Sequence, residues 1–317
     1  MSASRREISV ALAIAALAVA LAFAAPEFFT GENLTDVFLA NAPVLIVSLG
    51  MTIVILTGQI DISVGSIFAI SSVGAGVLAK AGLPAALAAM GGCAIGALLG
   101  AMNGALVAYV KIPSIVVTLA TMIALRDALR WATQGAWIQD LPASFQWLGF
   151  SRAAYPAAVA VLAAALTLAM SWILRNVAAG RAIYATGSSE EAARLAGIRT
   201  ARVTFAVFVI LGTLTGLAAA VNAVRFDQIP SNTGLGLELK VIAAVVVGGA
   251  AITGGRGTVL GTVLGVILLG AMGPALTFAG FSAYWERAAQ GAIILAAIAL
   301  DAARLEQHAN RFAASRA

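Results

Sequence analysis

Very few residues in this sequence could carry out covalent or metal chemistry. The chain has one histidine, His308, in a polar stretch near its end, and one cysteine, Cys93, inside an apolar run. A catalytic pair or a metal centre needs several such groups close together. The glycine-rich run at Gly254 lacks the spacing and the lysine of a phosphate-binding loop. We therefore expect no catalytic residue, no metal site and no cofactor bound by this chain.

Asp61 is the carboxylate with the clearest setting for a functional role. It follows Gly58 and Gln59 in the stretch TGQIDISVGS, between two apolar runs. Together with Ser63 it could cap the next helix, or it could lie where a membrane helix is interrupted beside a pathway or gate. Other polar positions in the apolar runs could likewise bond to neighbouring helices or to a polar solute. The pathway candidates are Asn41, Gln59, Asp61, Ser63, Asn103, Thr118 and Thr121.

The stretch GSSEEAARLAGI, residues 187–198, is polar in an otherwise apolar chain. Ser188 and Glu191 have the spacing of a capping box, which satisfies backbone N–H groups at the start of a helix. Gly197 can adopt the left-handed conformation that ends a helix. These signals predict a short helix over residues 190–196. Because so short a helix is marginal by itself, it must rest on its own bundle or fit a groove on another protein, and both remain open.

The composition indicates which elements must position these residues. Of the 317 residues, 61% are hydrophobic and 10% are charged, and the mean hydropathy is +0.98. A soluble core cannot bury so much apolar surface, so we expect an all-α polytopic membrane protein without a separate soluble domain. Breaks at proline, glycine and charged clusters predict ten transmembrane helices. They cover about residues 8–25, 37–57, 62–79, 84–110, 113–133, 154–174, 201–221, 239–253, 258–278 and 285–303.

The distribution of lysine and arginine predicts the orientation of these helices. The formal net charge is +5, and the cations are spread over loops that alternate with the apolar runs. This spacing is typical of the positive-inside rule and does not form a nucleic-acid-binding patch. We expect cytoplasmic tails at residues 1–7 and 304–317, a transmembrane domain at residues 8–303, and the largest cytoplasmic loop at residues 175–200.

Two series of glycines predict close contacts between helices. Glycines four residues apart lie on one helix face, where a neighbouring backbone can approach closely. The two series fall in helices that would run in opposite directions, which suggests an inverted repeat. The helix-packing glycines are Gly92, Gly96, Gly100 and Gly104 in one series and Gly257, Gly261 and Gly265 in the other.

Two groups of charged residues are expected at the outer ends of the helices. We expect Arg126, Asp127 and Arg130 to pair with one another near the end of the fifth span, or to contact a partner protein. A second group, which frames the loop after the seventh span, is a candidate docking rim. It consists of Arg225, Asp227, Glu238 and Lys240.

Four stretches resemble the membrane subunits of ATP-binding-cassette (ABC) importers, specifically the ribose/xylose/rhamnose/autoinducer-2 permease family. They are LTGQIDISVGSIFA from Leu56, NGALVAYVKIPSIVVTLATM from Asn103, GRAIYATGSSEEAARLAGI from Gly180 and GGAAITGGRGTVLGTVLG from Gly248. They occur in the family order, and the resemblance extends over nearly the whole chain.

The resemblance implies a permease in the bacterial inner membrane that moves a monosaccharide or sugar-like solute, such as ribose, rhamnose or autoinducer-2. It implies a homodimer or heterodimer of permease subunits surrounded by membrane lipid, a periplasmic sugar-binding protein, and cytosolic ABC ATPases that use ATP and Mg²⁺. The polar stretch would contact the ATPase, so the coupling residues would be Gly187, Ser188, Glu190, Glu191, Ala192, Arg194, Leu195 and Gly197.

Two other transport functions compete with this interpretation. An ion-coupled secondary carrier could use Asp61 as its ion-binding carboxylate, but it would not explain the polar helix. A branched-chain amino-acid permease is a related ABC importer. The segment IDISVGS resembles the sugar branch more closely.

Overall fold

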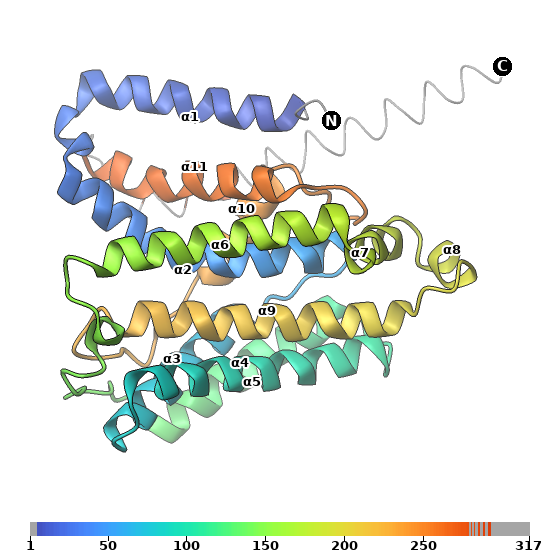
Figure 1. Ribbon diagram of the computed structural model, residues 1–317, viewed down its shortest axis with the longest axis horizontal. Coiled ribbons are helices and arrows are strands. Elements are labelled where there is room, and N and C mark those ends of the chain that lie inside the picture. The colour runs from blue at the N-terminus through green and yellow to red at the C-terminus, as the bar shows by residue number, and fades with distance from the viewer. Residues whose placement is uncertain are drawn as a thin grey trace.

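The computed structural model describes residues 5–278 and, beyond them, residues 280, 282, 285, 288, 291 and 292. This part of the chain is an elongated bundle of helices (Figure 1). Its two 3₁₀ helices are η1, Pro26–Phe29, and η2, Gln146–Gly149. Its α-helices are α1 Arg5–Ala24, α2 Gly31–Leu56, α3 Val64–Lys80, α4 Ala85–Ala108, α5 Ser114–Thr133, α6 Tyr155–Asn176, α7 Ala178–Ser188, α8 Glu190–Leu195, α9 Thr200–Ala223, α10 Leu237–Val247 and α11 Val259–Phe278.

Six of these helices, α1, α2, α4, α6, α9 and α11, are long and apolar enough to cross a membrane. The all-helical polytopic prediction is therefore confirmed for the described residues. Helix α5 is also long, but it carries Arg126, Asp127 and Arg130. Helix α3 has 17 residues, fewer than the ~20 of a typical transmembrane helix. The predicted tenth span, residues 285–303, and the tail at 304–317, with His308, lie outside the described residues.

The predicted eighth span, residues 239–253, is wrong as a continuous helix. Helix α10 has only 11 residues and ends at Val247. The chain then turns over residues 248–258, where Gly249, Gly254 and Gly255 have φ of 101°, 88° and 71°. These left-handed conformations are accessible to glycine without a steric penalty. An apolar run that suggested one span therefore contains a short helix and a glycine-rich turn.

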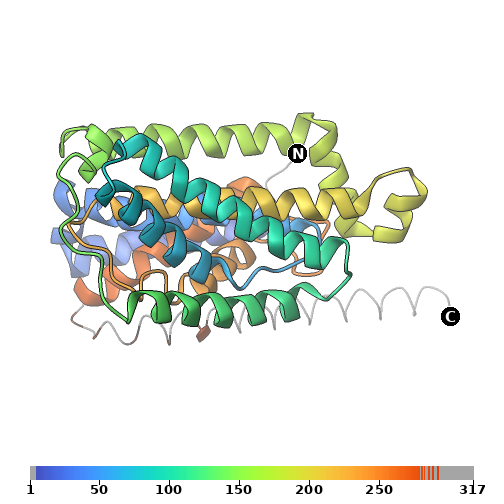
Figure 2. The same ribbon diagram turned by 90° about the horizontal axis from the view of Figure 1, so that it is seen from below.

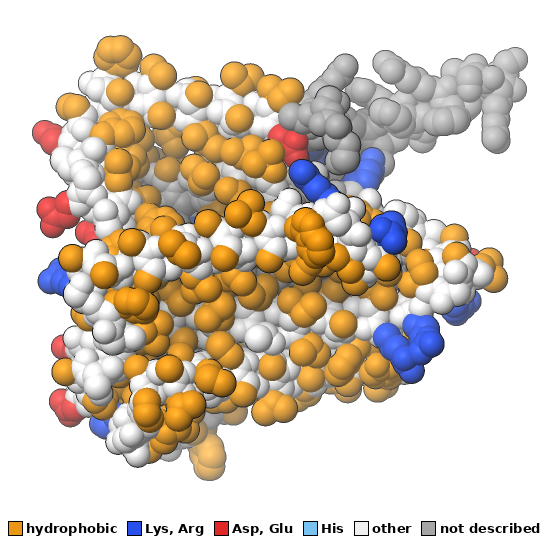
Figure 3. All heavy atoms as spheres, in the orientation of Figure 1, with side chains coloured by type: hydrophobic (Ala, Val, Ile, Leu, Met, Phe, Trp, Pro, Cys, Tyr) orange, Lys and Arg blue, Asp and Glu red, His pale blue; other side chains and the backbone are white. Residues whose placement is uncertain are grey.

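Helices α2 and α9 form the centre of the bundle, while α1 and α6 lie at its periphery. Helix α4 crosses α9, and α5 and α6 lie on opposite sides of the bundle (Figure 2). The Tyr155 hydroxyl at the start of α6 donates a 2.5 Å hydrogen bond to the carbonyl of Val221 on α9. Hydrophobic side chains cover much of the face shown in Figure 3, between the two ends of the bundle, as expected of a surface that faces lipid.

The first glycine series lies against α9. A Cβ atom at Gly96 would overlap the carbonyl oxygen of Gly212, and one at Gly100 would overlap that of Phe208. Gly92 faces Ser71 on α3 as well as α9, and Gly104 lies against Phe208. The α4 and α9 backbones are therefore separated by less space than one methyl group needs.

The second glycine series lies against α10 and the turn that follows it. A Cβ at Gly261 would overlap the carbonyl oxygen of Gly248, and one at Gly265 would overlap that of Ala244. Gly257 is not part of α11, because the helix begins at Val259 and Gly257 has φ 154°. The prediction that Gly257 opens this helical series is therefore wrong.

Candidate functional site

Helices α7 and α8 project from one end of the bundle (Figure 1). The predicted capping box of Ser188 and Glu191 is wrong, because the cap is the next residue, Ser189, and its N3 position is Ala192. Ser188 is the last residue of α7, and its hydroxyl donates to the Tyr184 carbonyl at 2.9 Å. Ser189 is the N-cap of α8, and its hydroxyl accepts a 3.2 Å hydrogen bond from the Ala192 N–H group. Because α7 continues through Ser188, that residue has a helical conformation and cannot cap the next helix.

The predicted end of the short helix is confirmed. Gly197 has φ 84°. Its N–H group donates to the carbonyl of Arg194, and the N–H group of Ile198 donates to the carbonyl of Ala193, both at 3.0 Å. This pair of bonds is a Schellman motif, which satisfies carbonyl groups at a helix C-terminus. Helix α8 therefore has a side-chain cap at its start and a glycine stop at its end.

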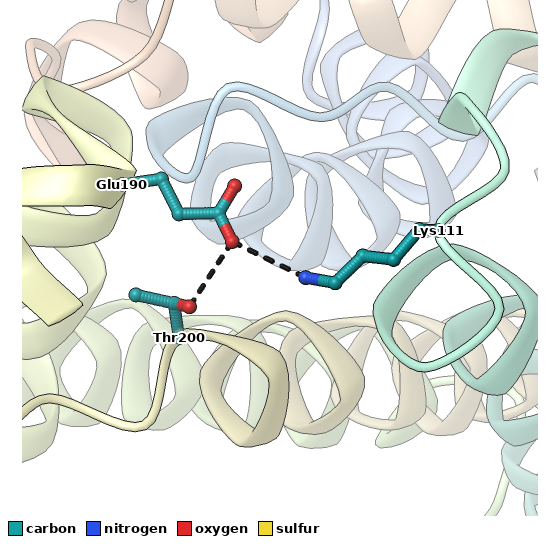
Figure 4. A network of polar contacts seen from close by, with 3 residues as sticks. All are labelled: Lys111, Glu190 and Thr200. Atoms are coloured by element: carbon teal, nitrogen blue, oxygen red, sulfur yellow. Dashed lines mark hydrogen bonds and ion pairs between the residues drawn. The ribbon is translucent and has the colours of Figure 1, made fainter.

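Glu190 connects α8 to the rest of the bundle (Figure 4). Its Oε1 atom lies 3.3 Å from Lys111 Nζ and accepts a 3.1 Å hydrogen bond from the Thr200 hydroxyl. Lys111 lies between α4 and α5 and has φ 66°, which is uncommon for a residue with a side chain. Ala193 faces the bundle, whereas Leu195 is 83% exposed. Helix α8 is thus bonded to the bundle through Glu190, and the apolar side chain of Leu195 remains exposed on it.

The end of α7 packs against two non-helical segments of the bundle. One follows α2 and the other is the turn between α10 and α11, and glycines lie at these contacts. A Cβ atom at Gly187 would overlap the Leu56 carbonyl oxygen, at the end of α2, and would crowd the N–H group of Gly255. The Gly255 N–H group itself donates to the Leu56 carbonyl at 2.9 Å. Gly254 packs in the same way against Gly58 and Gly187. We call the four residues Gly58, Gly187, Gly254 and Gly255 the glycine junction.

Asp61 lies in the non-helical segment that connects α2 and α3, and it does not cap α3. Its Oδ1 atom accepts hydrogen bonds from the Ser63 N–H group at 2.8 Å and from the Ser63 hydroxyl at 2.6 Å. Asn103 Nδ2 donates to the Ser63 hydroxyl oxygen at 2.8 Å. All three residues are fully buried. Asp61 Oδ2 and Asn103 Oδ1 have no hydrogen-bond partner among the described residues.

This polar cluster also includes the first turn of α5. The Ser114 hydroxyl accepts a 3.3 Å hydrogen bond from the Ile60 N–H group, and the buried Thr118 hydroxyl donates to the Ser114 carbonyl at 2.8 Å. Thr121 donates to the Thr118 carbonyl at 3.2 Å. Of the predicted pathway residues, the structure therefore brings together Asp61, Ser63, Asn103, Thr118 and Thr121, with the partly exposed Gln59 nearby in sequence.

Asn41 is separate from this cluster. Its amide group donates to the Val37 carbonyl at 2.8 Å and to the Gly270 carbonyl on α11 at 3.2 Å. These bonds connect α2 and α11, a common use of an amide side chain within a membrane.

Arg126 forms a second buried polar site, between α5 and the segment before α10. It is 8% exposed, and its Nη1 atom donates a 2.9 Å hydrogen bond to the Thr233 carbonyl. The prediction that Arg126 pairs within its cluster is therefore wrong, although Asp127 and Arg130 do pair, at 3.4 Å. A charged side chain buried inside a membrane protein is costly and is usually functional.

The predicted docking rim is also divided. The Glu238 carboxylate packs against Gly65 in the first turn of α3, and Arg225 Nη1 donates to the Leu39 carbonyl at 2.9 Å. Asp227 is exposed. Glu238 therefore belongs with the α3–α10 contact and not with the exposed loop.

Comparison with known proteins identifies the class of molecule that carries these features. Residues 33–298 match the family described as branched-chain amino acid transport system / permease component. The chain belongs to this permease family. It is an ABC-type import permease and a multi-pass protein of the inner membrane, in agreement with its six apolar helices of spanning length.

Similar proteins cover almost the full chain. The autoinducer 2 import system permease protein LsrC of Escherichia coli (strain K12 / DH10B) is 36% identical over 94% of this chain and 87% of its own length. The proteins of the same description from Yersinia pseudotuberculosis serotype O:1b (strain IP 31758) and Salmonella typhi are 35% and 36% identical over the same share of this chain, and over 85% and 86% of their own length. No solved structure matches the chain.

Proposed function

We propose that this chain is the membrane-spanning subunit of an importer that carries a monosaccharide or sugar-like solute of the ribose, rhamnose or autoinducer-2 class. The similarity to permeases of autoinducer 2 import systems, over 94% of the chain, supports this solute class. The family description also names branched-chain amino acids, so leucine is the relevant competing solute.

The observation that carries the coupling part of this proposal is the glycine junction. Helix α7 ends at a point where α2 ends and where the turn between α10 and α11 passes. A force applied to α8 would therefore reach both non-helical segments, the one after α2 and the turn between α10 and α11, through direct backbone contacts. Movement of such elements between two packed arrangements is the usual basis of alternating access.

The proposed partner at α8 is a cytosolic ABC ATPase, which would bind ATP and Mg²⁺ and supply the energy. The exposed Leu195 offers an apolar contact, and Glu190 holds the helix on the bundle through Lys111 and Thr200. A periplasmic sugar-binding protein would deliver the solute at the opposite end. Two permease subunits, identical or different, would complete the transporter.

The proposed pathway includes the buried polar cluster around Asp61, the buried Arg126 and the nearby Glu238. Asp61 and Asn103 each have an oxygen without a partner among the described residues, and Glu238 has another. Such oxygens can accept hydrogen bonds from solute hydroxyl groups. An ion-coupled carrier would not require the capped α8 helix, and an ABC permease family is not a carrier family, so we do not favour that alternative.

Uptake by the chain, reconstituted in vesicles with its ATPase and binding protein, tests the proposal. We expect ATP-dependent uptake of autoinducer-2, ribose or rhamnose and none of leucine; leucine uptake alone would contradict the solute class.

In Gly187→Ala, the added methyl group would separate α7 from Leu56 and reduce uptake severalfold while ATP hydrolysis continues. Gly31→Ala, where a Cβ atom meets nothing within 4 Å, is the matched control. Normal coupled uptake by Gly187→Ala would contradict the role of the junction.

A further inference from the structure

A cavity of about 530 Å³ lies where α6 ends and α11 begins. It is separate from the glycine junction and from the buried polar cluster. Its wall includes Ser171, Leu174 and Arg175 from α6, Tyr184 from α7, and Arg256 and Thr258 from the turn before α11. Ser171 and Arg175 are four residues apart and therefore share one face of α6. The lining of the cavity thus combines apolar and polar groups.

The charges around this cavity favour an anion. Arg175 and Arg256 are both exposed, and neither has an ion-pair partner among the described residues. The N-terminus of α11, a 20-residue helix, begins beside the cavity at Val259 and adds partial positive charge. Glu7 is an acidic residue bonded to the cavity wall, where its carboxylate accepts a short hydrogen bond from the Thr258 hydroxyl. The cavity is therefore lined by two guanidinium groups and the start of a helix, and no carboxylate is among its lining residues.

The wall of the cavity is held in place by α7. The Tyr184 hydroxyl donates a 2.8 Å hydrogen bond to the Gly257 carbonyl. Burial raises the pKa of Tyr184, and the Arg175 guanidinium offsets part of this effect. The hydroxyl therefore remains a hydrogen-bond donor at neutral pH. This bond connects α7, which leads into α8, to the turn that carries Arg256.

The surface next to the cavity is apolar. On α6, Leu168 and Trp172 are 69% and 61% exposed, and on α11 Leu260 is 51% exposed. Tryptophan is enriched where a transmembrane helix meets the lipid headgroups. Leu168 and Trp172, four residues apart, form an apolar strip that runs along α6 toward the helix end that carries Arg175. This strip is suited to contact with acyl chains, and Trp172 favours headgroup depth for this end of α6.

We propose that this cavity binds the phosphate of an anionic phospholipid headgroup, with the acyl chains against the exposed faces of α6 and α11. Arg175 and Arg256 bind the phosphate oxygens, since guanidinium groups form paired, charge-assisted hydrogen bonds with phosphate. Basic pockets between transmembrane helices are known to select anionic lipids in this way. Because the turn at Arg256 is bonded to α7 through Tyr184, the bound lipid also stabilises the position of α7.

Native mass spectrometry of the full chain in detergent, titrated with phosphatidylglycerol or phosphatidylcholine, tests the proposal. We expect phosphatidylglycerol to bind more tightly, and Arg175→Gln or Arg256→Gln to weaken its binding about tenfold, the effect of losing one charge-assisted hydrogen bond. Arg202→Gln removes one charge from an exposed residue outside the cavity and should not change the affinity. Arg175→Lys keeps the charge and should lose less affinity, which separates binding from misfolding.

Three results would overturn this assignment. Equal binding of the two lipids, or equal loss in all three glutamine variants, would show no specific site. Displacement of the lipid by millimolar inorganic phosphate, with no effect of acyl-chain length, would assign the cavity to a free phosphate. Loss of the bound lipid when the partner ATPase is added, with protection of Arg175 and Arg256 from chemical modification, would assign it to a protein interface.

Discussion

At the scale of single residues, Glu190 and Glu191 differ in position although they are identical and adjacent. Both lie in the first turn of α8, where a carboxylate is favoured by the helix dipole. Glu190 also contacts Lys111 and Thr200, whereas Glu191 is exposed and forms no hydrogen bond or ion pair with the described residues. The position of α8 relative to α4 and α9 therefore depends on Glu190.

We predict that Glu190→Gln reduces uptake more than Glu191→Gln. The Lys111–Glu190 pair is half exposed, so its loss should change the free energy of unfolding by about 1 kcal/mol or less. If the same contact stabilises one position of α8 over another by about 1 kcal/mol, its loss changes the ratio of the two positions roughly fivefold. Uptake and ATP hydrolysis should be measured at equal amounts of permease in the membrane. Equal uptake in the two variants would show that the contact has no role in coupling.

Local sequence patterns predicted some of this site and could not predict the rest. Gly197 was identifiable because a helix stop depends on the residues beside it. The cap is Ser189 and not Ser188, because α7 continues through Ser188, and the pattern of two adjacent serines does not show where α7 ends. Lys111 is 79 residues from Glu190, and Gly255 is distant from both Leu56 and Gly187. Such pairings depend on helix packing, which no local pattern contains.

At the scale of elements, glycine has two different effects in this chain. Within α4 it permits close helix packing, and the regular spacing of the glycines predicted that surface. After α10 it ends the helix, because several glycines there have positive φ. Mean hydropathy does not distinguish these cases, since both stretches are apolar. This is why the long helices were predicted well and the short α10 was mistaken for a complete span.

We predict that Gly96→Ala destabilises the protein and that Gly91→Ala does not. At Gly96 the added Cβ atom would overlap the backbone of Gly212, which cannot move without shifting α9. At Gly91 it would meet only the end of the flexible Leu78 side chain. Overpacking of this kind costs typically about 1–3 kcal/mol. Thermal unfolding in detergent compares the two variants on the same helix, and equal melting temperatures would contradict the close packing of α4 and α9.

At the scale of the whole molecule, the two ends of the bundle differ in charge. Lysine and arginine side chains gather near α7 and α8, and most visible aspartate and glutamate side chains lie at the opposite end (Figure 3). The face between the two ends is rich in hydrophobic side chains (Figure 3), and six helices are long and apolar enough to cross a membrane. Since cations are retained on the cytoplasmic side of bacterial membrane proteins, this polarity favours an orientation with α8 in the cytoplasm.

We predict that α8 and the loop after α9 are accessible from opposite sides of the membrane. In a Cys93→Ser background, Leu195→Cys and Phe226→Cys each provide one exposed thiol. A charged maleimide cannot cross the hydrocarbon core, so in spheroplasts it should label Phe226→Cys at once and Leu195→Cys only after the membrane is opened. Cys93→Ser alone is the control and should remain unlabelled. The reverse pattern would place α8 outside and exclude a cytosolic ATPase as its partner. With the orientation correct, co-expression of that ATPase should decrease labelling of Leu195→Cys and leave Phe226→Cys unchanged, because only α8 would be covered.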